Sequence, residues 1–143
     1  MSDQVLLEQR DGLLTIRLNR PDRRNAMTPE MTQGLTEALA AAAEDPQVRA
    51  VILTGTGGHF CVGGDVKAMN AGAGAERPPG QRLHHLRDRM SAAHYLHAMP
   101  KPTIAAIQGS AAGAGLSLAL ACDLRICAAD AKLTTAFAKV ALS

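Results

Sequence analysis

The sequence predicts an α/β fold made of strands followed by helices, and three observations support this class. Strand patterns begin at Val5, Arg49 and Thr103, and a helical pattern follows each of them. Two glycine-rich loops, residues 55–65 and 109–115, each separate a strand from the start of a helix. The 143 residues, 47% of them hydrophobic, suffice for one core, so we expect residues 1–143 to form one domain.

A β-hairpin is predicted at the start of the chain. Apolar and polar residues alternate in residues 5–10 and again in residues 13–20. Asp11-Gly12 lies between the two runs and has the composition of a two-residue hairpin turn. Asn19-Arg20-Pro21 then leaves the predicted sheet.

The next elements are a capped helix and a buried strand. Thr28 suits the N-cap and Pro29 the first helical position, and Asp45-Pro46 ends the helical pattern. The predicted buried side of this helix carries Leu35, Leu39 and Ala42. Residues 49–54 form a short apolar strand, which we expect to be buried on both faces of a parallel sheet.

Residues 70–80 are rich in alanine, glycine and proline, and we expect them to form a mobile loop. A helix is predicted over residues 81–99. The residues expected on its buried face are Leu83, Leu86, Met90, Ala93 and His97.

The stretch from Lys101 to Ala129 reads as a strand, a turn, a helix and a second strand. The strands are expected over residues 103–107 and 123–128, and the helix over residues 113–121, after the turn of residues 109–115. Helix N-termini present unpaired N–H groups that attract anions. The small residues of the turn allow a ligand to approach this backbone, although they also suit tight helix packing alone. Neither nucleotide-binding glycine pattern fits the spacing.

Composition excludes several classes of function. A net charge of +2 and three aromatic residues disfavour a nucleic-acid partner. No apolar run is long enough to span a membrane, and three cysteines without a CxxC pair suit reduced thiols, so we expect a cytoplasmic protein. His94 and His97 have a spacing that metal sites use, but no further ligand is evident, and we expect no metal.

Three motifs, in this order, resemble the enoyl-CoA hydratase/isomerase (crotonase) family. They are Asn19-Arg20-Pro21 with Asn25-Ala26, then VILTGTGGHFCVGGD, then KPTIAAIQGSAAGAG with LALACDLRIC. The resemblance implies a crotonase-like spiral of ββα units. It covers the whole chain but only about the first half of a family member, so the C-terminal helical trimerisation region is expected to be missing.

The resemblance also implies a site for an acyl-CoA thioester. In the family, one backbone N–H from each glycine-rich loop holds the thioester oxygen and stabilises an enolate. Carried onto this chain, the two catalytic donors are the N–H groups of Gly64 and Ala114. The residues implied to lie along coenzyme A are Arg23, Arg24, Ala26, Gly64, Asp65, Val66 and Lys67. Coenzyme A would be part of the substrate, and no other cofactor is expected.

This chain departs from the hydratases of the family at both catalytic glutamate positions, which correspond to Ser117 and Phe137. Isomerisation is therefore favoured over hydration, and the sequence is more similar to the phenylacetate-pathway ring isomerase branch. In that branch an aspartate beyond Ser143 moves the proton. Asp65 is expected to cap the helix that follows it, Asp123 to be structural, and Ser117 to bond its own helix backbone.

Two alternatives remain open at this point. The first is a non-catalytic acyl-CoA-binding module, because neither expected position carries a carboxylate. The second is a truncated, inactive family member. Family members form trimers or hexamers through C-terminal helices, so this chain should expose apolar surface and associate with other chains.

Overall fold

Strands and helices alternate along the chain in this computed structural model, which describes residues 3–65 and 79–136. The elements are β1 (Val5–Arg10), β2 (Leu13–Leu18), η1 (Pro21–Arg23), α1 (Pro29–Glu44), β3 (Ala50–Gly55), α3 (Pro79–Ala98), β4 (Thr103–Ile107), β5 (Ser110–Ala112), α4 (Ala114–Ala121), β6 (Leu124–Cys127) and β7 (Lys132–Thr134). The predicted α/β class is confirmed, and each predicted strand and helix that lies in the described residues is present.

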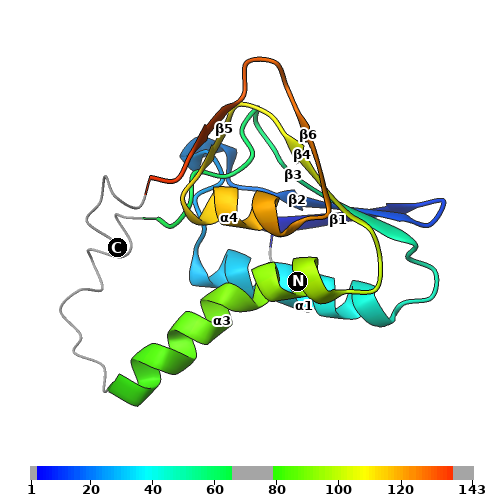
Figure 1. Ribbon diagram of the computed structural model, residues 1–143, viewed down its shortest axis with the longest axis horizontal. Coiled ribbons are helices and arrows are strands. Elements are labelled where there is room, and N and C mark those ends of the chain that lie inside the picture. The colour runs from blue at the N-terminus through cyan, green and yellow to red at the C-terminus, as the bar shows by residue number, and fades with distance from the viewer. Residues whose placement is uncertain (1–2, 66–78, 137–143) are drawn as a thin grey trace.

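The main sheet has five strands in the order β1-β2-β3-β4-β6 (Figure 1). β1 and β2 pair antiparallel, and the remaining neighbours are parallel. Asp11 (φ 52°) and Gly12 (φ 84°) form the turn between β1 and β2. Two successive residues with positive φ are what a type I′ turn requires, which confirms the predicted hairpin.

One face of this sheet carries the core. In β2, Leu14, Ile16 and Leu18 are buried, while the residues between them are half-buried. Figure 1 shows α1, α3 and α4 on the same side of the sheet. β3 is parallel to both neighbours as predicted, but Ala50 and Ile52 are only half-buried. The expectation of full burial on both faces was therefore wrong, since helices cover one face in the described part of the chain.

Helix α1 follows its sequence signals closely. The Thr28 hydroxyl accepts a hydrogen bond from Met31 N–H at 3.1 Å, and Pro29 is the first helical residue. Leu35 and Leu39 are fully buried against the sheet. Local sequence alone specifies this helix from its cap to its buried side.

Helix α3 buries only part of the face predicted for it, since Ala93 packs against the core as expected but two other predicted residues do not. Ala92, Leu96 and Met99 are in the core, whereas Met90 is 61% exposed and His97 is exposed. The buried residues follow a spacing of four and three, so they form a helical stripe of their own that meets α1 and α4. The other predicted apolar positions, Leu83 and Leu86, have side chains outside the described set.

The predicted mobile loop over residues 70–80 lies mostly outside the described residues. Its last two positions, Pro79 and Gly80, belong to α3, which begins two residues earlier than expected.

The turn predicted over residues 109–115 contains a strand that sequence reasoning missed. Ser110–Ala112 forms β5, which pairs in parallel with β7. Three residues are too few to show a strand period in the sequence. After β5, Gly113 turns the chain with φ 52° and ψ −124° into α4. Gly115 then lies directly on the backbone of Cys61, which joins the two glycine-rich loops.

Large apolar side chains are exposed on α4, β6 and β7. Leu120 is 61%, Leu124 59% and Ile126 66% exposed, and Leu133 is also exposed. Every residue of β6, at the edge of the main sheet, is exposed. Apolar surface is thus present as expected, and association with other chains stays a prediction.

Replacing Gly115 with alanine should separate the two glycine-rich loops. The added Cβ would lie 2.2 Å from the Cys61 carbonyl oxygen, which is closer than real contacts allow. We expect the Gly115→Ala variant to lose at least about 2 kcal/mol of unfolding free energy, measured by urea denaturation with circular dichroism. Gly58→Ala is the control, because its Cβ meets nothing within 4 Å and only its φ of 81° is unfavourable. Equal stability of the two variants would contradict this assignment.

Two buried thiols should make the fold sensitive to alkaline pH. Burial raises the pKa of Cys61 to about 11 and that of Cys122 to about 11, from 9.0. Between pH 9 and about pH 11 the two thiols lose their protons in the unfolded chain but keep them in the native state. The unfolding free energy should therefore fall as pH rises from about 9 to about 11, by up to roughly 3 kcal/mol per thiol.

Urea unfolding from pH 8 to pH 11 measures this slope, which should be shallower in Cys61→Ala. Cys127→Ala, which changes the exposed thiol, is the matched control. Identical slopes for the wild type and Cys61→Ala would contradict the role of this thiol.

Candidate functional site

The two glycine-rich loops lie side by side. This arrangement is needed if the N–H groups of Gly64 and Ala114 are to bind one oxygen atom. The second loop runs along the first, and Gln108 Nε2 also donates to Gly55 O at 2.9 Å. Three backbone hydrogen bonds join the loops: Phe60 N–H to Gln108 O (2.9 Å), Cys61 N–H to Ser110 O (3.1 Å) and Ala112 N–H to Cys61 O (2.9 Å). Residues 50 positions apart in the sequence are therefore fixed against each other by their backbones.

Gly64 is held on its other side by the segment before α1. Met27 N–H donates to Gly63 O at 2.7 Å, and Asp65 N–H donates to Met27 O at 3.1 Å, which makes a parallel bridge between Met27 and Gly64. In a parallel bridge of this kind the residue between the two bonded groups, here Gly64, points its own N–H away from the partner strand. The Gly64 N–H has no acceptor among the described residues, so it is available to a ligand.

Ala114 is the first residue of α4. N–H groups at this end of a helix have no acceptor inside the helix, and they carry the positive end of its dipole. The preceding residue, Gly113, is held by a hydrogen bond from its N–H to Thr134 O at 3.0 Å. No acceptor for Ala114 N–H occurs within residues 3–65 and 79–136.

The two N–H groups are close in space. A Cβ placed on Gly63 would lie 3.3 Å from Ala114 N and 3.0 Å from Ala112 O. Because covalent geometry fixes that Cβ close to the nitrogen of the next residue, Gly64 N and Ala114 N lie within roughly 7 Å of each other. Glycine at position 63 leaves the space beside them open. Chemically, such a pair of backbone donors suits an oxygen that carries or develops negative charge.

Arg20 holds the end of the first loop in place through hydrogen bonds. Sequence analysis did not assign this residue to the site. Arg20 Nη1 donates to Ala26 O at 2.6 Å, and both Nη atoms donate to Asp65 Oδ2 at 3.2 Å. The side chains are 19% and 18% exposed. Asp65 was predicted to cap a following helix and to lie along coenzyme A; its observed partner is Arg20, and the segment that follows lies outside the described residues.

Asn25 makes the neighbouring turn rigid. It is fully buried, its Oδ1 accepts from Arg20 N–H at 2.8 Å, and its Nδ2 donates to Thr56 O and His59 O. The motif Asn19-Arg20-Pro21 with Asn25 signalled this network in the sequence, but spacing alone did not reveal the contacts.

The predicted coenzyme A residues fall into three groups. Arg23 and Arg24 are exposed, and Arg23 lies 3.7 Å from the Asp22 carboxylate. Ala26 is buried, and its carbonyl is occupied by Arg20. Val66 and Lys67 lie outside the described residues. Solvated arginines at positions 23 and 24 remain able to pair with a phosphate.

The carboxylate and hydroxyl groups near the loops have structural partners. Asp123 Oδ2 accepts from Thr103 N–H at 2.8 Å and from its hydroxyl at 3.1 Å, which confirms the structural role predicted for Asp123. Ser117 Oγ donates to Gly113 O at 3.3 Å, as expected of a helix residue that bonds its own backbone. Phe137 lies outside the described residues.

The described residues contain no group of three or more metal-ligating side chains. His94 and His97 are exposed on α3. In the same part of the chain, no helix combines the length and the apolar composition needed to cross a membrane.

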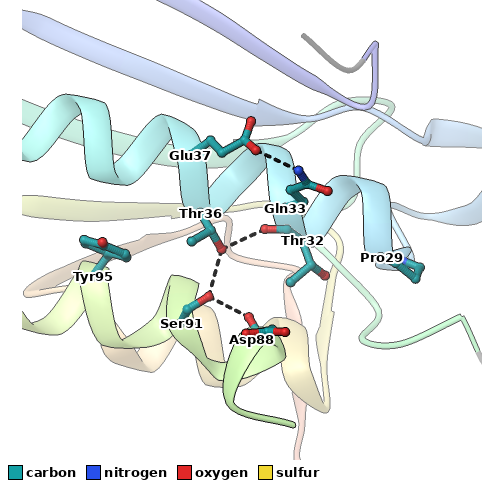
Figure 2. Close-up of a pocket in the computed structure, with 8 residues that line it drawn as sticks. All are labelled: Pro29, Thr32, Gln33, Thr36, Glu37, Asp88, Ser91 and Tyr95. Atoms are coloured by element: carbon teal, nitrogen blue, oxygen red, sulfur yellow. Dashed lines mark hydrogen bonds between the residues drawn. The ribbon is translucent and has the colours of Figure 1, made fainter. Parts of the chain in front are cut away.

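A groove of about 550 Å³ lies between α1 and α3, away from the glycine-rich loops in sequence (Figure 2). Two hydroxyl groups in the groove lie close together and bond to the helix backbones: Thr36 Oγ1 lies 3.0 Å from Ser91 Oγ, which donates to Asp88 O at 2.5 Å. Thr36 Oγ1 also donates to Thr32 O at 2.8 Å. These contacts join the two helices. Two carboxylates, those of Glu37 and Asp88, also line the groove, and Glu37 accepts a hydrogen bond from Gln33 Nε2 at 2.8 Å.

Comparison with known proteins identifies the family of this chain. The family model for enoyl-CoA hydratase/isomerase matches residues 8–142. A Mycobacterium tuberculosis protein named probable enoyl-CoA hydratase echA14 is 44% identical over 140 residues, which are 98% of this chain and 53% of that protein. The 1,2-epoxyphenylacetyl-CoA isomerase of Escherichia coli is 36% identical over 99% of this chain and 54% of its own length.

Solved structures give the same result. The crystal structure of an enoyl-CoA hydratase from Polaromonas sp. JS666 superposes with a TM-score of 0.88 at 35% identity, covering 97% of this chain and 53% of that one. The predicted crotonase-type fold is thereby confirmed. The chain spans about half the length of the relatives that it matches, and it belongs to the enoyl-CoA hydratase/isomerase family.

Proposed function

We propose that this chain binds an acyl-CoA thioester and that the N–H groups of Gly64 and Ala114 both donate to its carbonyl oxygen. The supporting observation is that two backbone donors without an acceptor among the described residues lie within roughly 7 Å of each other. Removing a proton next to the thioester carbonyl places negative charge on its oxygen, and such donors stabilise that enolate more strongly than the neutral substrate.

We further propose that the reaction is an isomerisation of an enoyl-CoA and not a hydration. Hydration by the family route uses two carboxylic groups, one to activate water and one to protonate carbon. Here Ser117, at one of these positions, donates to Gly113 O, and an alcohol is too weak an acid and too weak a base to replace a carboxyl group in proton transfer at neutral pH. Isomerisation needs one base that moves a proton between two carbons. The expected base aspartate would follow Ser143 in the family pattern.

A non-catalytic acyl-CoA-binding module is the second candidate. It is favoured by the contacts of Asp65 and Asp123, the carboxylates nearest the loops in the sequence, since Arg20 holds one and Thr103 the other. Both proposals share the same two backbone donors and differ only in whether a proton is moved. Homo-oligomer formation and a cytoplasmic location remain predictions.

Ala114→Pro tests the donor pair, because proline removes the N–H at a helix position that tolerates it. We expect butyryl-CoA to bind the variant about fivefold to tenfold more weakly, the effect of one lost hydrogen bond. The thioether butyl-CoA, which lacks the carbonyl oxygen, should bind wild type and variant equally. Calorimetric titration measures both ligands, and Ala114→Gly, which keeps the N–H, is the matched control. Equal weakening of both ligands would count against the donor role.

The choice of reaction is tested by giving two substrates to a version of the protein that continues past Ser143, where the family pattern places the expected base aspartate. We expect trans-3-enoyl-CoA to be converted to its trans-2 isomer, and trans-2-enoyl-CoA to remain unhydrated, with products followed by chromatography. Hydration of the trans-2 substrate would overturn the isomerase assignment. Binding of both thioesters without conversion would instead favour the binding module.

A further inference from the structure

The direction of the Gly64 N–H depends on contacts made by other residues, because Gly63 and Gly64 have no side chains of their own. Within the loop, Cys61 Sγ accepts a hydrogen bond from Gly63 N–H at 3.4 Å. Gly63 has a φ of 94°, and both residues 63 and 64 are glycines that can adopt many backbone conformations. The bridge to Met27 holds the two peptide groups that flank Gly64, one through Gly63 O and the other through Asp65 N–H. Whatever fixes the separation of these two segments therefore fixes the donor.

Arg20 spans these two segments. Its guanidinium donates to Ala26 O at 2.6 Å on one side and to Asp65 Oδ2 at 3.2 Å on the other. Ala26 directly precedes Met27, and Asp65 directly follows Gly64. A guanidinium is a rigid planar fork, so it holds two acceptors at a set distance where a lysine ammonium would not.

Burial separates Arg20 from a phosphate-binding role. The Arg20 side chain is 19% exposed and forms an ion pair with Asp65, whose side chain is 18% exposed. The Arg23 side chain nearby is 52% exposed. Buried hydrogen-bonded ion pairs cost much stability when one member is removed and are good candidates for a specific structural task. The task that these contacts define is the spacing of the Met27–Gly64 bridge.

We propose that Arg20 is a positioning residue: by bridging Ala26 O and Asp65 Oδ2, it aims the Gly64 N–H at the thioester oxygen of an acyl-CoA. This inference rests on the function proposed above. Arg20 touches no reacting atom in this scheme. Its effect should appear in the recognition of the carbonyl and not in the binding of coenzyme A as a whole.

The test uses Arg20→Lys, which keeps the charge but not the fork. Butyryl-CoA and butyl-CoA are titrated calorimetrically, and the carbonyl stretch of bound butyryl-CoA, labelled with carbon-13 at the carbonyl, is measured by infrared difference spectroscopy. We expect the affinity for butyryl-CoA to fall about fivefold or more, with butyl-CoA changed less than about twofold. The downshift of the carbonyl stretch on binding should shrink as well.

Arg17→Lys is the matched control, since Arg17 makes a more exposed ion pair with Glu8 at 3.3 Å on the sheet. Asp65→Asn, which keeps the side-chain shape, should reproduce the Arg20→Lys pattern and replaces it if that variant does not fold. Equal weakening of both ligands, or an unchanged carbonyl stretch, would overturn the positioning role while leaving the proposed function intact. A wild type that does not distinguish butyryl-CoA from butyl-CoA would instead refute the proposed function, and this inference with it.

Discussion

The backbone contact between Cys61 and residues 110–112 is the constraint on which the site depends. Cys61 donates to Ser110 O and accepts from Ala112 N–H, so one residue of the first loop is paired with both flanks of Ala111 in the second. These bonds involve backbone atoms only, and Cys61 is fully buried. Any shift of one loop therefore moves the other, and the two donors keep their relative position.

Small residues make this contact possible, and larger residues could not take their places. Gly115 lies on the Cys61 carbonyl, and Gly113 takes a backbone conformation that other residues strongly disfavour. The same glycines contribute no side chains to the backbone of the site, where Cys61 Sγ accepts from Gly63 N–H at 3.4 Å. Support comes instead from polar residues of the segment before α1, where Asn25 and Arg20 are mostly buried and fully engaged.

Local signals in the sequence predicted the elements that local chemistry determines. Asp11-Gly12 specified the hairpin, and Thr28 with Pro29 specified the start of α1. The buried face of α3 was not predictable in this way, because Met90 and Leu96 are equally apolar and only the neighbouring elements decide which is covered. The pairing of Arg20 with Asp65 spans 45 positions and has no periodic signature. Only the family resemblance led to the prediction of Gly64 and Ala114 as donors, since a backbone N–H group does not depend on the type of side chain.

The exposed edge strand β6 has a consequence for how this chain behaves in solution. Among the described residues no strand pairs with the outer edge of β6, which therefore offers a row of backbone donors and acceptors. Leu124 and Ile126 add apolar side chains on one face of this strand. Natural sheets usually protect such edges from pairing with another chain by lysine, proline or a bulge. In β6 the one charged residue is Arg125. The strand can therefore pair with an exposed strand of another chain by β-augmentation, so we expect this edge to favour association in solution.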